Sequence, residues 1–380
     1  MKKLKRYINR SKSIVTGKKN LEHLYSFKDF PVFMGCVDGP QKDDIVADME
    51  WMIDPETGII QLKKLIPLKI LYLNQHCDGT GQIWQDHYSE FARFIKKHKP
   101  GKNILEIGGA HDWIAKNYMN LVADVNWTII EPNPQYVKND KIKVTKGWFD
   151  EKFTIDQPIN TIIHSHVLEH VYEPVKYLQH ISGFLKEGDK HIFTFPNMFE
   201  QLTRKYTNCL NFEHTVFLTE YIVDYLLKKY GFNILAKDYF KDHSIFYATE
   251  KIDKIQTDLS ENKYDEYKKI FFDFINYHKE MVGDLNKKMD NMKEPIYLFG
   301  AHIFATYLFA FGLKQDKIVF ILDNSPGKQK KRLYGTHFKV ESPKILKDKG
   351  SINLILKAGI YNEEIKKDIL ENINDQVIFW

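Results

Sequence analysis

The chain has few cysteines and no long apolar run. Its 380 residues contain three cysteines, Cys36, Cys77 and Cys209. They are too few and too scattered for a disulfide framework, so the cytoplasm is the expected compartment. No apolar stretch approaches the roughly 20 residues that cross a bilayer, and no apolar signal core stands near Met1. The sequence therefore predicts a protein without a membrane span.

The chain also lacks a large excess of one charge. Its 55 basic and 50 acidic residues leave a net charge of +5, which is small for a nucleic-acid binder. Lysines and arginines gather at 2–19 and 328–332, and we interpret both runs as solvated surface. No nucleic-acid partner is expected. The length predicts two or three domains.

One predicted turn contains two adjacent glycines, Gly108 and Gly109, in a stretch of the chain that otherwise has few. The strand predicted at 103–107 ends in Gly108 and Gly109, and no further glycine appears until Gly147. The turn therefore lacks the G-x-G-x-x-G loop that holds a dinucleotide pyrophosphate. Glu106 and Asp112 flank the glycines and would repel phosphate, whereas they favour a cofactor with positive charge. Glycine lets a ligand approach the backbone closely.

Two further motifs follow at regular spacing. A second predicted strand, 127–130, ends in Glu131, where such folds place the acid that binds both ribose hydroxyls. The motifs LEIGGAHD at 105–112, IEP at 130–132 and HSHVLEHV at 164–171 resemble those of class I S-adenosylmethionine-dependent methyltransferases.

The resemblance implies S-adenosylmethionine as the cofactor and a role for each motif. Its sulfonium and methionine would lie near Glu106, Gly108, Gly109 and Asp112, and its ribose on Glu131. Ser165 and His166 would line the same pocket. The adenine would lie near the end of the third strand, at Trp148, Phe149 and Asp150.

The predicted architecture is α/β, with a doubly wound central domain between two others. Residues 1–97 form an N-terminal substrate or lid module, 98–252 the methyltransferase domain, 253–292 a helical linker and 293–380 a C-terminal Rossmann-like domain. Apolar spacing predicts a helix over 83–97, with Trp84, Phe91 and Phe94 buried. The linker carries apolar residues at spacings of three and four: Tyr264, Tyr267, Ile270, Phe271, Phe274 and Ile275.

This segment order is similar to that of the sugar C-methyltransferase family. The likeness rests on the central domain, on Glu213-His214 after its fifth strand, and on the run from Gly300 to Pro343. It implies an N-terminal zinc module, a C-terminal Rossmann-like domain and a nucleotide-linked keto sugar as acceptor. Glu213 and His214 match the family's catalytic pair.

Two departures change what is expected. Cys36 and Cys77 are isolated, so they cannot complete a four-cysteine zinc site, and no metal is expected. The family's catalytic tyrosine is replaced by His76 in the run NQH at 74–76. We therefore favour O-methylation of a sugar hydroxyl, with C-methylation of a keto sugar as the alternative.

Histidine suits the required base because its unperturbed pKa lies near neutrality. His214 is the preferred base, with Glu213 orienting its ring, and His76 is the alternative. Substrate contacts are expected from Tyr72, Asn74, His87 and Tyr88.

The remaining histidines predict no metal site. His164 and His166 alternate along a strand and are expected on one face, with His170 starting the next helix. No cysteine pair or third ligand at metal-binding spacing accompanies them.

The sequence thus predicts a methyltransferase that acts on a sugar. We expect a nucleotide-linked sugar and a role in surface-polysaccharide or sugar biosynthesis. A noncatalytic cofactor-binding scaffold and a dehydrogenase or epimerase built on the C-terminal unit are the alternatives. The oligomeric state, including a homodimer, stays open.

Overall fold

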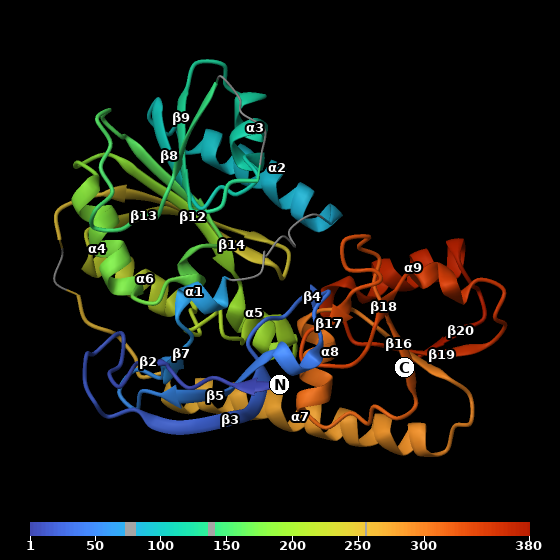
Figure 1. Cartoon of the computed structure of the whole chain (residues 1–380). Helices are drawn as coiled ribbons and strands as arrows, with labels where there is room; N and C mark the ends of the chain where they lie inside the picture. Colours follow the sequence, from blue (N-terminus) through green and yellow to red (C-terminus); the bar gives the residue numbers. More distant parts are fainter. Residues whose placement is uncertain (73–80, 136–140, 255–256) are drawn as a thin grey trace.

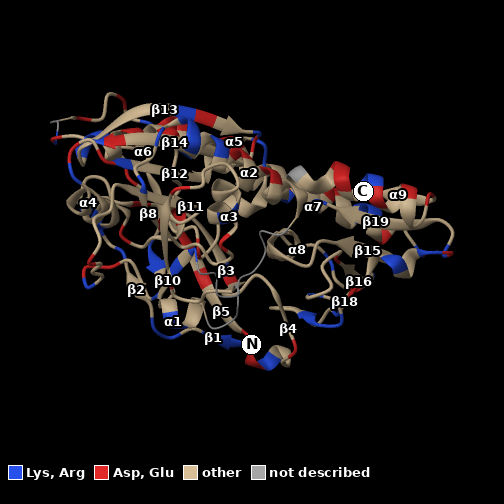
Figure 2. Ribbon diagram, turned by 90° about the horizontal axis from the view of Figure 1, so that it is seen from above, with Lys and Arg blue, Asp and Glu red and all other residues tan. Residues whose placement is uncertain are grey.

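The computed structural model describes residues 1–72, 81–135, 141–254 and 257–380. Three sheets follow one another along the chain (Figure 1). Basic and acidic residues are mixed over all three parts (Figure 2). Within the described residues, no helix has the length and apolar character needed to cross a membrane.

The N-terminal module is built on a four-stranded sheet of order β1-β5-β3, with β6 paired to β5. β3 and β5 are antiparallel, and Trp51, Phe27 and Phe30 on these strands are almost fully buried. A two-stranded ladder of β2 and β7 leads into the short helix α1. The bounds are β1 Lys2–Lys3, β2 Ile8–Asn9, β3 Glu22–Pro31, β5 Ile45–Ile53, β6 Ile60–Leu62, β7 Lys64–Leu65 and α1 Leu68–Leu71.

The central sheet has seven strands in the order β10-β9-β8-β11-β12-β14-β13. All pair in parallel except β14, which is antiparallel to β12 and β13. The connections change direction between β8 and β11, and ligands bind beside such a switch point at the carboxyl ends of the strands. The bounds are β8 Asn103–Ile107, β9 Asn126–Glu131, β10 Ile142–Lys146, β11 Thr161–Ser165, β12 Lys190–Pro196, β13 Phe232–Phe240 and β14 Ser244–Lys251.

Helices cover both faces of this sheet (Figure 1). α2 and α3 pack together on one face, in a core that includes Phe91, Phe94 and Trp127. The expected helix at 83–97 is therefore confirmed, with Phe91 and Phe94 buried as expected, whereas Trp84 is half-buried. α4 and α6 contact each other on the other face. The bounds are α2 Gln82–Lys97, α3 Trp113–Met119, α4 Pro174–Phe184, α5 Met198–Thr203 and α6 Glu220–Lys229.

The expected linker helix is confirmed as α7, Tyr264–Asp290. Phe271 and Phe274 in its first half belong to the core shared by the N-terminal and central parts. Leu285 and Met289 in its second half belong to the core of the C-terminal unit. One continuous helix thus contributes to two cores.

The C-terminal unit is a parallel five-stranded sheet of order β18-β16-β15-β19-β20. α8 and α9 belong to this unit, and Leu308 of α8 and Ile369 of α9 lie in two of its apolar clusters. The bounds are β15 Ile296–Phe299, α8 Ile303–Ala310, β16 Ile318–Leu322, β18 Val340–Glu341, β19 Ile352–Leu356, α9 Asn362–Asn372 and β20 Val377–Phe379.

The first and last parts of the chain are joined directly. β4 (Cys36–Val37) pairs with β17 (Arg332–Leu333). The Arg332 guanidinium donates to both carboxylate oxygens of Asp44, at 2.6 and 2.8 Å, and the Asp44 side chain is 3% exposed. A buried bidentate pair of this kind fixes orientation as well as contact. The β4–β17 strand pair and the Arg332–Asp44 ion pair thus hold the N-terminal module against the C-terminal unit.

Candidate active site

The glycine turn lies at the carboxyl end of β8, in the centre of the sheet. Gly108 has φ +78°, which favours glycine, and its N–H donates to the carbonyl of Ile130 at 3.0 Å. A Cβ on Gly109 would lie 2.8 Å from the carboxyl group of Glu106. The conformation and packing of this turn therefore require glycine at both positions.

The acids of the turn are buried under it. Glu106 is 2% exposed, and its Oε2 accepts a hydrogen bond from Trp127 Nε1 at 2.7 Å. Burial raises the pKa of Glu106 to about 8. Asp112 is 1% exposed, with the Lys116 ammonium 2.8 Å from its Oδ1. This turn suits a cation, because a positive charge would relieve the buried carboxylates.

Cofactor binding is expected to release a proton from Glu106. Between the usual carboxyl pKa and about 8, the free protein holds this group largely protonated. A cationic ligand beside it lowers the pKa and drives ionisation. Calorimetry at pH 7 in two buffers of different ionisation enthalpy should show release of up to one proton. The Glu106→Gln variant should release fewer protons on cofactor binding, by the amount that Glu106 contributes. The same number of protons released by both proteins would contradict the assignment.

Glu131 ends β9 beside the turn, as expected for a ribose-binding acid. It is 8% exposed, and its Oε1 accepts from the backbone N–H of Asn133 at 2.7 Å. Burial raises the pKa of Glu131. The second carboxylate oxygen is the group that would meet the ribose hydroxyls.

We expect Glu131→Gln to weaken S-adenosylmethionine binding about tenfold. Hydrogen bonds to a charged acceptor contribute about 1.5–3 kcal/mol, and the amide keeps the shape but not the charge. Calorimetry with S-adenosylhomocysteine measures the change. An exposed acid in the turn before β12, substituted as Glu187→Gln, is the control, and equal affinities in all three proteins would remove Glu131 from the site.

The third-strand residues lie beside an open cavity of about 550 Å³. Phe149 is half-buried and lines this cavity together with Asp150, Tyr177 and His180. Trp148 is 52% exposed, and its ring centroid lies 6.4 Å from that of Tyr72. An aromatic wall with a neighbouring acid suits a flat heterocycle with an exocyclic amine.

The turn after β11 differs from the expectation of one shared face. His166 has φ +53°, and its ring contacts Trp84 of α2, whereas the ring of His164 contacts Tyr177 of α4. His164 instead meets His191, with 2.9 Å between the two Nε2 atoms. His170 ends a short 3-10 turn, Leu168–His170, rather than starting a helix. The alternation argument was therefore wrong, because the strand ends at Ser165 and the backbone turns.

Ser165 and His166 lie at the binding edge. The Ser165 hydroxyl is buried and has no hydrogen-bond partner among the described residues. His166 Nδ1 lies 3.2 Å from Glu169 Oε1, and His166 Nε2 lies 2.8 Å from the Ser244 hydroxyl. The unpartnered hydroxyl fits a polar ligand such as the cofactor.

Glu213 and His214 lie in a wider acid and histidine cluster. The ring centroids of His170 and His214 are 4.9 Å apart, and His170 Nδ1 lies 3.7 Å from Glu213 Oε2. Glu169 Oε1 is 4.0 Å from His170 Nε2. Burial alone would raise the pKa of Glu169, but the nearby His166 and His170 lower it below its usual value. The structure thus adds Glu169 and His170 to the expected pair.

The His214 ring has a defined tautomer in this cluster. Its Nδ1 lies 3.2 Å from the carbonyl oxygen of Cys209, so Nδ1 carries the proton and donates. Nε2 then holds the free electron pair. Burial, and then His170, lower the pKa of His214 to about 4. The ring is therefore neutral at pH 7 and able to accept a proton.

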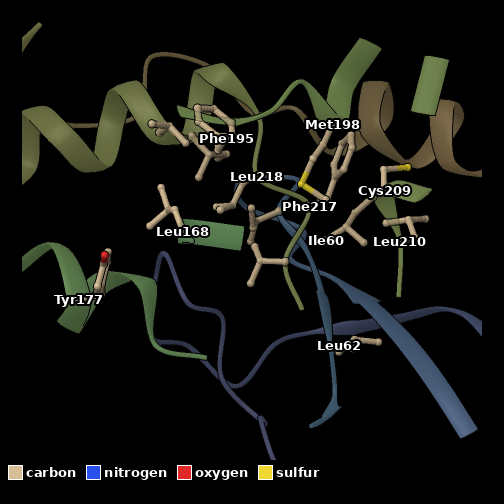
Figure 3. Close-up of a cluster of buried hydrophobic side chains, with 14 of the residues drawn as sticks. Ile60, Leu62, Leu168, Tyr177, Phe195, Met198, Cys209, Leu210, Phe217 and Leu218 are labelled. Atoms are coloured by element: carbon tan, nitrogen blue, oxygen red, sulfur yellow. The ribbon is translucent and has the colours of Figure 1, made fainter. Parts of the chain in front are cut away.

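The segment that carries Glu213 and His214 is held at several points. The Asn211 side chain accepts from the N–H groups of both residues, at 2.7 and 2.8 Å. The following residues pair with β6 of the N-terminal module through Thr215 and Phe217. Figure 3 shows Phe217 and Leu218 in one buried apolar cluster with residues of both parts. These contacts fix Glu213 and His214 relative to both the module and the sheet.

The expected substrate residues are distributed around this region. Burial, followed by the negative charge of Glu213, raises the pKa of Tyr72, which places its phenol near the cluster. Tyr88 lies on α2 with its ring centroid 5.1 Å from that of Trp113. His87 on the same helix is 0% exposed. Asn74 and His76 lie outside the described residues.

The described residues include two groups of three that could hold a metal ion: His87, His166 and His243, and Glu169, His170 and His214. No cysteine takes part in either group. Cys36 donates to the carbonyl of Ala301 and Cys209 is buried, while Cys77 lies outside the described residues. The first group could not be predicted from the sequence because its members come from three distant segments.

In the C-terminal unit, Asp323 follows strand β16, and both of its carboxylate oxygens already accept hydrogen bonds from the backbone. Asp323 Oδ2 accepts from the N–H of Ala301 at 2.9 Å, and Asp323 Oδ1 from the N–H of Ser325 at 2.9 Å. The Asp323 carboxylate, which a dehydrogenase would use to bind ribose, thus stabilises the two neighbouring turns instead.

Comparison with known proteins agrees with this geometry. Residues 83–237 match the model of a methyltransferase domain, and residues 241–377 that of a C-methyltransferase C-terminal domain. No curated protein matches the chain.

Solved structures resemble parts of the chain at low identity. A putative S-adenosylmethionine-dependent methyltransferase from Listeria monocytogenes is 14% identical, with a TM-score of 0.34, over 43% of this chain and 98% of its own. Human N-acetylserotonin methyltransferase is 16% identical, with a TM-score of 0.40, over 49% of this chain and 60% of its own. The matched domains, the strand order and the glycine turn together identify the chain as an S-adenosylmethionine-dependent methyltransferase with the class I Rossmann-like fold.

Proposed function

We propose that the enzyme methylates a nucleotide-linked sugar, and that His214 removes the proton from the acceptor. The cluster of Glu169, His170, Glu213 and His214 carries this proposal, because a neutral histidine faces acids and a second histidine beside the cofactor turn. When bound, S-adenosylmethionine supplies an electrophilic methyl group on its sulfonium.

The chain's own residues would bind and align both molecules. Gly108 and Gly109 allow the close approach, Glu131 holds the ribose, and the cavity beside Phe149 receives the adenine. His214 Nε2 accepts the acceptor's proton, and Glu213 and Glu169 stabilise the imidazolium that forms. Bound S-adenosylmethionine would supply the methyl group to the acceptor's electron pair and would leave as the neutral thioether.

We favour a carbon atom of the sugar as the acceptor of the methyl group. The C-terminal match is to a domain of C-methyltransferases, which supports C-methylation of a keto sugar over the O-methylation favoured from the sequence. Removal of a proton next to a ketone places negative charge on the carbonyl oxygen, so the reaction needs a hydrogen-bond donor to that oxygen as well as the base. His170 supplies a further polar group that the sequence interpretation did not count.

O-methylation is the second candidate because His76 stands where the resemblance expects tyrosine. A histidine at that position suits removal of a hydroxyl proton. His76 itself could serve as the base in that reaction.

One assay separates the two reactions. The purified enzyme is incubated with keto and hydroxy nucleotide sugars and ¹³C-methyl-labelled cofactor, and the product is examined by mass and carbon NMR. We expect a gain of one methyl group bound to carbon, and exchange of the proton beside the ketone in D₂O. A methyl group on oxygen without exchange would favour the second candidate. Cofactor binding with no turnover on any sugar would favour a binding scaffold.

A further inference from the structure

We infer that His87, His166 and His243 form a binding site for one divalent transition-metal ion of the Zn²⁺ type. One ligand atom from each ring lies within 4.8 Å of the others. The residues come from α2, from the turn after β11 and from the turn between β13 and β14. The site would join three elements at the carboxyl edge of the sheet.

The spacing of the rings fits a single ion. The centroid of His87 is 5.2 Å from that of His166 and 5.5 Å from that of His243, and the third separation is 5.3 Å. Three imidazoles bound at about 2.0–2.1 Å in a tetrahedral arrangement have centroids about 5 Å apart. The near-equal triangle therefore needs little change to close on an ion.

Two of the rings are also held from outside the triangle. Glu169 Oε1 lies 3.2 Å from His166 Nδ1, and the Thr194 hydroxyl lies 3.4 Å from His87 Nε2. Metal-binding histidines commonly use one nitrogen for such a partner and the other for the ion. The Ser244 hydroxyl contacts two of the three rings, 2.8 Å from His166 Nε2 and 2.5 Å from His243 Nδ1, and its contact with His166 is the one that an ion would replace.

One ring nitrogen of the three histidines makes no hydrogen bond within the described residues. His87 Nδ1 is buried and has no hydrogen-bond partner among the described residues. Such a group is rare unless a ligand, ion or water completes it.

The surroundings select the kind of ion. Three neutral imidazoles suit Zn²⁺, Ni²⁺ or Cu²⁺, whereas Mg²⁺ and Ca²⁺ require oxygen ligands. The Trp84 ring lies 4.8 Å from His166 and 4.5 Å from His243 between centroids, which limits access by water. Three protein ligands would leave the fourth position for water or another ligand.

Titration of the metal-free full-length protein with Zn²⁺ and with Co²⁺ tests the site. We expect one equivalent to bind, with Co²⁺ giving the strong visible absorption of a four-coordinate ion. His87→Ala and His243→Ala should each weaken binding at least 100-fold. His278→Ala is the matched control, because His278 is 3% exposed and bonds to the Phe274 carbonyl outside the triangle.

A further variant distinguishes the second group of potential ligands. His170→Ala should leave metal binding unchanged; binding lost there but kept in His87→Ala would place the ion at Glu169, His170 and His214 and overturn the inference. Absence of stoichiometric binding to the wild-type protein would overturn it as well. A variant that loses its native circular dichroism is replaced by His243→Gln. Metal binding is read without cofactor or substrate, so the result is independent of the proposed function.

Discussion

His214→Ala is expected to lower kcat by about 10²- to 10⁴-fold, the usual contribution of a positioned base. S-adenosylmethionine should bind to the variant nearly as tightly as to the wild type, because the ring lies at the cluster rather than at the glycine turn. Steady-state kinetics and calorimetry measure the two effects separately. Exogenous imidazole should restore part of the lost activity.

The pH dependence gives the same prediction an independent check. The pKa of His214 is about 4 and the neutral ring is the active form. Activity limited by this group should therefore be constant near neutrality and fall as the pH drops towards 4. His23→Ala, at an exposed histidine bonded to Ser26, is the control and should keep full activity. A His214→Ala enzyme with wild-type turnover would assign the base elsewhere, with His76 as the first candidate.

Gly109→Ala should weaken S-adenosylmethionine binding about 100-fold. The added methyl group would lie 2.8 Å from the Glu106 carboxyl and 3.0 Å from Ile129 Cγ2, both buried. Overpacking of a buried site costs about 1–3 kcal/mol, and the displaced turn would no longer fit the cofactor. Calorimetry gives the affinity and thermal unfolding gives the stability.

Gly183→Ala is the matched control for this substitution. Gly183 lies in α4 of the same domain, and a Cβ there meets nothing within 4 Å. Alanine in an exposed helix is about 0.5–1 kcal/mol more favourable than glycine, so this variant should bind normally and unfold no earlier. Normal cofactor affinity in Gly109→Ala would show that the ligand does not approach this turn.

The strands and their terminal acids could be predicted because their signals are local. Residues 103–107 form β8 as expected, and Glu131 ends β9 in the position that the motif indicated. Apolar spacing alone predicted α2 and α7. The class I fold followed from the order of these short motifs.

The composition of the site could not be predicted in the same way, because it depends on distant contacts. His170 meets Glu213 only after the chain has passed through β12 and α5. The triangle of His87, His166 and His243 depends on three separate segments and on the positive φ of His166. The alternation rule placed His166 beside His164 because the end of β11 at Ser165 has no clear local signal.

The pairing of Asp44 with Arg332 has a consequence during synthesis of the chain. A ribosome adds roughly 5–20 residues per second, so Asp44 emerges on the order of 15 to 60 seconds before its partner. During that interval β4 has no strand to pair with, and the carboxylate that the guanidinium later covers is open to solvent. The N-terminal module therefore completes its contacts only after the chain has been made as far as β17, although the module itself is made first.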